Sequence, residues 1–131
     1  MELHYKFIGI TLIMLAFVHA FFPKYFKWKE ELKHLSLINR QMMLVHTFFI
    51  ALVLFLMGIL CIVAPNELIE TKLGKIISIG LGIFWATRLF FQFFIYSATL
   101  WKGKTFETII HILFIILWSY LSVVFFYTAL I

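Results

Sequence analysis

Four long apolar segments take up most of this chain and decide what it can fold into. They are predicted over residues 5–22, 42–63, 76–97 and 108–131. About 20 mostly apolar residues cross a hydrocarbon core roughly 30 Å thick, so each segment is long enough for one membrane-spanning helix. The expected fold class is all-α: an integral membrane four-helix transmembrane bundle, running up-down-up-down.

Composition supports the same class. Hydrophobic residues make up 64% of the chain and charged residues 13%, which is far from the balance of a soluble domain. We expect one transmembrane domain over residues 1–131, without room for a separate soluble catalytic domain. The single cysteine, Cys61, excludes an internal disulfide framework and a CxxC metal motif. Glu2 offsets Lys6 before the first segment, and no small-residue cleavage motif lies near its end, so we expect a mature helix rather than a signal peptide.

Residues 24–38, between the first two segments, form an amphipathic stretch. Tyr25, Trp28, Leu32 and Leu35 recur at helical spacing, and lysines occupy the other faces. This pattern predicts a helix lying in the membrane interface, where basic side chains attract anionic lipid head groups. A solvated basic loop is the alternative. Either explanation accounts for the net charge of +5 without nucleic acid as a partner.

The distribution of basic residues predicts an orientation. Seven lysines and arginines belong to the two connections on one side of the membrane: Lys24, Lys27, Lys29, Lys33, Arg40, Lys102 and Lys104. Such connections are normally cytoplasmic, so both termini are expected outside the cytoplasm, in a bacterial inner (plasma) membrane. The expected partners are the lipid bilayer and either other membrane subunits or a second copy of this chain.

Three histidines in apolar segments give the main lead to function. His19, His46 and His111 are predicted at nearly the same depth as Gln92, and Arg88 lies one turn deeper. Ionisable groups inside a membrane are costly, and they usually face the bundle interior or a functional site. Helical spacing puts polar and aromatic residues in two stripes, one of Trp85, Arg88, Gln92 and Tyr96 and one of Glu107, His111, Trp118 and Ser122.

This polar layer suggests a redox cofactor. His19, His46 and His111 with Glu107 would make a first shell for a transition metal ion. Alternatively, His46 and His111 would be the axial ligands of haem b, with Arg88, Arg40 or nearby lysines pairing its propionates and Gln92 in the same polar layer. Either cofactor would serve electron transfer or membrane oxidoreductase chemistry.

Two other interpretations stay open. In the first, the protein is a non-catalytic accessory or assembly subunit of a larger membrane complex, and its polar side chains hold helices together. In the second, it is a lipid- or anion-binding carrier in which Arg88 receives an anionic head group. The sequence has no P-loop, HExxH or GxSxG motif and no aspartate, so no catalytic residue is assigned.

Overall fold

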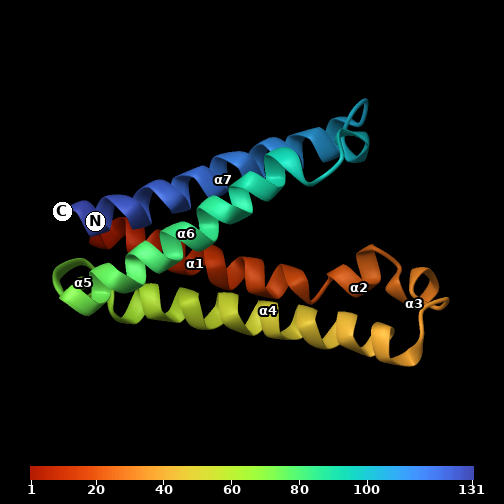
Figure 1. Ribbon diagram of the computed structural model, residues 1–131, viewed down its shortest axis with the longest axis horizontal. Helices are drawn as coiled ribbons and strands as arrows, with labels where there is room; N and C mark the ends of the chain where they lie inside the picture. The colour runs from red at the N-terminus through yellow and green to blue at the C-terminus, as the bar shows by residue number, and fades with distance from the viewer. The chain divides into compact units, whose positions relative to one another are not determined.

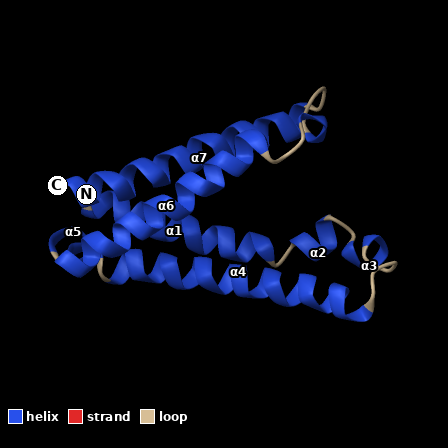
Figure 2. Ribbon diagram, in the orientation of Figure 1, coloured by secondary structure: helices blue, strands red, loops and turns tan.

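The computed structural model describes residues 1–131 and consists of helices joined by short loops (Figure 2). Its four long helices are α1 (Glu2–His19), α4 (Leu37–Val63), α6 (Lys72–Phe94) and α7 (Thr105–Leu130). All four are long and apolar enough to cross a membrane. The expected all-α fold with four membrane-spanning helices is confirmed. Each helix begins three to five residues earlier than predicted, because its backbone hydrogen bonding continues beyond the apolar run.

The chain divides into two compact units, residues 2–65 and residues 66–131 with Met1. Each unit is a hairpin of two long helices (Figure 1). In the first hairpin (residues 2–65) α1 packs against α4, and in the second hairpin (residues 66–131) α6 packs against α7.

Two glycines set the spacing of the first hairpin. A Cβ atom built on Gly58 of α4 would lie 2.7 Å from the carbonyl oxygen of Gly9 on α1. A Cβ atom built on Gly9 would lie 2.6 Å from the carbonyl oxygen of Gly58. Real Cβ atoms do not approach oxygen so closely, so only glycine allows this contact. Small residues at such crossings are typical of helices that associate in membranes.

The connection between α1 and α4 contains two single-turn helices, α2 (Phe22–Tyr25) and α3 (Trp28–Glu31). The connection is therefore partly helical, but the single interfacial helix predicted over residues 24–38 is not continuous. Lys27 interrupts it, because its φ of 54° is left-handed and cannot continue a right-handed helix.

The short helix α5 (Pro65–Glu70) precedes α6 at the start of the second hairpin. Thr71 caps α6, and its Oγ1 accepts a hydrogen bond of 2.9 Å from the backbone N–H of Gly74. Between α6 and α7 the chain forms the 3₁₀ turn η1 (Ala98–Leu100) and reverses at Gly103, whose φ is 77°. On α6, Gly82 makes room for the ring of Phe126 on α7.

Large apolar side chains cover the outside of the long helices. Phe7, Leu56, Ile83 and Ile116 are each more than half exposed. A soluble monomer rarely exposes so much contiguous apolar surface, whereas lipid solvates it readily. The protein is therefore a membrane protein whose long helices lie in a lipid bilayer.

Candidate functional site

A hydrogen bond between helices fixes the register of the second hairpin. The Gln92 side-chain nitrogen on α6 lies 2.7 Å from His111 Nδ1 on α7. Two turns further along, Trp85 stacks on Trp118, with ring centroids 4.9 Å apart and planes inclined by 14°. Trp85 and Gln92 are seven residues apart on α6, and His111 and Trp118 are seven residues apart on α7. The antiparallel register is therefore the same at both contacts. The two predicted stripes therefore face each other across the hairpin.

Arg88 lies between these two contacts. Its Nη1 donates a hydrogen bond of 3.3 Å to Gln92 Oε1, one turn along α6. The guanidinium carbon lies 5.2 Å from the ring centroid of Tyr96 and 5.3 Å from that of Trp118. Both distances are within cation–π range. Arg88 is half-buried, whereas Gln92 is 5% exposed.

This network determines the tautomer of His111. Arginine can only donate, so the Gln92 amide must turn its oxygen towards Arg88 and its NH₂ group towards His111. His111 Nδ1 consequently accepts the hydrogen bond, and the ring proton sits on Nε2. In this state Nδ1 is occupied and Nε2 is an N–H donor, so neither nitrogen offers a free lone pair to a metal ion.

Trp101, in the connection, covers the face of the His111 ring. The two rings stack with centroids 3.7 Å apart and planes inclined by 12°. The Thr108 hydroxyl holds this part of the connection, since it lies 2.7 Å from the carbonyl oxygen of Trp101. Helical spacing does not relate Trp101 to His111. No helical periodicity relates a loop residue to a helix residue, so the sequence contains no signal for this contact.

The site is rich in donors and poor in acceptors. Arg88 forms no ion pair, and the salt bridge of 3.0 Å between Lys6 and Glu2 belongs to the first hairpin. The indole nitrogens of Trp85 and Trp118 are buried without a hydrogen-bond partner. Arg88, which engages Gln92 through one N–H group, keeps further donors that would suit a ligand bringing oxygen acceptors.

The other two predicted histidines belong to the first hairpin. His19 is the last residue of α1, and its Nδ1 donates to the carbonyl oxygen of Leu15 at 2.8 Å. Its ring lies 4.6 Å from that of Phe22, and it lines a small hollow of about 160 Å³ beside Ala20 and Thr47. His46 is exposed on α4 and does not line this hollow.

The structure gives the metal and haem hypotheses no supporting contact. Glu107 is exposed, one turn before His111, and no hydrogen bond or ion pair joins the two side chains. No group of three or more histidine, cysteine, aspartate or glutamate side chains is arranged to hold a metal ion. The proposed ligand sets remain sequence predictions. The contacts that do occur link Arg88, Gln92 and His111.

No protein-family model, no curated protein and no solved structure matches this chain. The fold itself defines the class, which is a membrane protein with four membrane-spanning helices. Its function has to be inferred from the side-chain chemistry of its own sites.

Proposed function

We propose that this protein is a lipid-binding carrier in which Arg88 receives the anionic head group of a phospholipid. One observation carries the proposal: Arg88 belongs to a membrane-spanning helix and has no carboxylate partner. An arginine costs roughly 2.5–3.5 kcal/mol at the centre of such a helix, and less towards the helix end, near which Arg88 lies. Cation–π contacts with two rings recover about 0.5–2 kcal/mol each. A phosphate would supply the acceptor that the site lacks.

The geometry around Arg88 suits a phosphate. A guanidinium presents its N–H groups as a planar fork that binds phosphate through two parallel hydrogen bonds. Gln92 engages only one of these donors, and the rings of Tyr96 and Trp118 restrict how the group can turn. The remaining donors are therefore preorganised.

The depth of Arg88 also suits a head group. Arg88 lies six residues before the end of α6, which corresponds to about 9 Å at 1.5 Å per residue. Its contacts with Gln92 and Tyr96 direct the guanidinium towards that end of the helix. Long basic side chains commonly extend towards the membrane interface in this way. A lipid phosphate drawn slightly below the interface would reach it.

We place this site on the cytoplasmic side of a bacterial inner membrane. Support comes from the Lys/Arg count, since Lys102 and Lys104 lie in the connection next to the site. Anionic lipids give that leaflet a negative surface potential, which would concentrate the proposed ligand around these lysines.

The proposal is tested by counting bound lipids. The protein is reconstituted in nanodiscs containing phosphatidylglycerol and phosphatidylcholine, then released for native mass spectrometry. Arg88→Gln is compared with Lys102→Gln, which removes an exposed positive charge near the same end of the hairpin. A hydrogen bond to a charged group contributes about 1.5–3 kcal/mol. We therefore expect Arg88→Gln to weaken phosphatidylglycerol binding about 10- to 100-fold, and Lys102→Gln to weaken it less than threefold.

Equal binding by the wild type and Arg88→Gln would overturn the proposal. A second outcome would also overturn it, in favour of the assembly-subunit interpretation. In that outcome Arg88→Gln keeps its lipids but loses a protein partner, or a second copy of the chain, that the wild type retains.

A further inference from the structure

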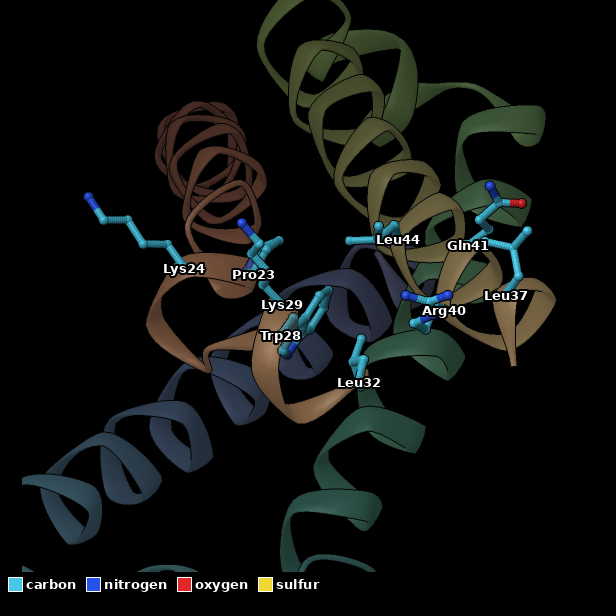
Figure 3. Close-up of a pocket in the computed structure, with 9 residues that line it drawn as sticks. All are labelled: Pro23, Lys24, Trp28, Lys29, Leu32, Leu37, Arg40, Gln41 and Leu44. Carbon is cyan, nitrogen blue, oxygen red and sulfur yellow. The ribbon is translucent and has the colours of Figure 1, made fainter. Parts of the chain in front are cut away.

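A second basic site lies in the first hairpin and shares no residue with the Arg88 site. A pocket of about 530 Å³ opens between the α2–α3 connection and the beginning of α4. Figure 3 shows Trp28 of α3 on one side and Arg40 and Leu44 of α4 on the other. Ligand pockets typically measure about 300–1,000 Å³, so this one would hold a polar head group and the first part of an acyl chain.

The charge lining this pocket has one sign. Lys24, Lys29 and Arg40 contribute to its wall, and no carboxylate does. Lys24 extends outward from the pocket (Figure 3), so its amine belongs to the rim. The nearest acidic residues in sequence, Glu30 and Glu31, are exposed and do not line the pocket.

Arg40 carries the one donor of this pocket that is buried without a hydrogen-bond partner. Its Nε is buried, and no hydrogen-bond acceptor in the chain reaches it. A buried donor without a partner costs about 1–3 kcal/mol, and more when it carries charge. Arg40 also lies in the first turn of α4, where the helix dipole adds positive potential.

The rest of the wall is apolar. Trp28, Leu32, Leu37 and Leu44 all line the pocket. A free phosphate ion would gain nothing from these side chains, whereas a glycerophospholipid would place the start of its acyl chains against them. The pocket lies in the connection between two membrane-spanning helices, which is where lipid head groups are found.

We propose that this pocket binds the phosphate of an anionic phospholipid, with Arg40 as the main anchor, Lys29 as a second cation and Trp28 against the glycerol and upper acyl chain. This site does not depend on Arg88. It explains why Arg40, in the first turn of α4, has a buried Nε without a hydrogen-bond partner.

The four tryptophans offer a readout that separates the two sites. Trp28 is the only tryptophan of the first hairpin, whereas Trp85, Trp101 and Trp118 belong to the second. The protein is labelled with fluorotryptophan, and the Trp28 ¹⁹F resonance is assigned from Trp28→Phe. Phosphatidylglycerol is then titrated into phosphatidylcholine nanodiscs holding the full chain. We expect a saturable shift of the Trp28 resonance.

Arg40→Gln is compared with Lys33→Gln, which removes an exposed charge from the same connection outside the pocket. We expect Arg40→Gln to raise the phosphatidylglycerol level that half-saturates the Trp28 shift about tenfold, and Lys33→Gln to change it less than twofold. Lys29→Gln, with an intermediate effect, keeps the test usable if Arg40→Gln fails to fold. Equal effects of Arg40→Gln and Lys33→Gln would overturn the proposal, because they would indicate only general surface attraction.

Soluble glycerol phosphate separates the two sources of a phosphate group. No Trp28 shift with this compound is the expected result. A Trp28 shift with glycerol phosphate, at the concentration at which phosphatidylglycerol shifts the same resonance, would overturn the assignment to a lipid. Absence of any Trp28 shift with phosphatidylglycerol, while the second-hairpin tryptophans respond, would overturn this proposal and leave the Arg88 proposal intact. A Trp28 shift without a response of the second-hairpin tryptophans would support the Arg40 site and contradict the Arg88 site.

Discussion

Replacing Gln92 by glutamate is expected to fill the Arg88 site from within the chain. The substitution is nearly isosteric and puts a carboxylate oxygen where the amide oxygen now accepts from Arg88 Nη1 at 3.3 Å. The added charge would then be the counter-ion that Arg88 lacks. The second carboxylate oxygen would face His111 Nδ1, so the ring proton must move from Nε2 to Nδ1 to keep this contact as a hydrogen bond. With this change of tautomer, we expect Gln92→Glu to compete with an anionic lipid and to keep the helix packing.

The size of the effect follows from this distance. Two unit charges about 3.3 Å apart attract each other by about 5 kcal/mol at an effective dielectric constant of 20. Removing the new carboxylate from water costs several kcal/mol, so the net change in folding free energy should stay below about 2 kcal/mol. The bound lipid, in contrast, loses most of the charge that attracts it. Its affinity should fall at least tenfold, which corresponds to about 1.4 kcal/mol.

Native mass spectrometry of lipid occupancy and thermal unfolding in detergent measure these two quantities. Gln92→Met is the control, because it removes the amide without adding a charge. We expect Gln92→Met to retain more lipid than Gln92→Glu, since the guanidinium keeps its free donors. Lipid binding by Gln92→Glu at the wild-type level would refute the role given to Arg88.

Two further predictions concern packing and orientation. Gly58→Ala would put a Cβ atom 2.7 Å from the Gly9 carbonyl oxygen and should destabilise the protein by about 1–3 kcal/mol in detergent unfolding. Gly80→Ala meets nothing within 4 Å and should be neutral or stabilising by up to about 1 kcal/mol, so equal effects of the two would contradict the close helix crossing. Lys102→Cys in inside-out vesicles should react with a membrane-impermeant maleimide, and Glu70→Cys should not. The opposite result would reverse the proposed orientation.

The sequence was sufficient to predict the four long helices of the fold. Four apolar runs predict four spanning helices, because lipid requires each spanning backbone to satisfy its own hydrogen bonds. The sequence was less informative about the connection after α1. Amphipathic spacing predicts one helix there, but it contains no signal for the left-handed conformation of Lys27 that divides the segment.

The candidate site was also predicted only in part. Helical spacing brought Arg88 and Gln92 onto one face, and similar depth brought His111 opposite them. Depth alone does not determine which helices are neighbours, so it could not distinguish His111, which joins this network, from His46, which is exposed on α4. Nor could spacing reveal the stacking of Trp101, since loop geometry decides that contact.

The most direct test of the Arg88 site uses the fact that the chain has only two arginines, Arg40 and Arg88. In Arg40→Lys every ¹⁵N-labelled guanidinium signal comes from Arg88. Solid-state NMR of this variant in phosphatidylglycerol membranes measures dipolar dephasing of that signal by lipid ³¹P. We predict clear dephasing, because the proposed site would hold the lipid phosphate in direct contact with the guanidinium. A guanidinium signal that ³¹P leaves unchanged would contradict the account.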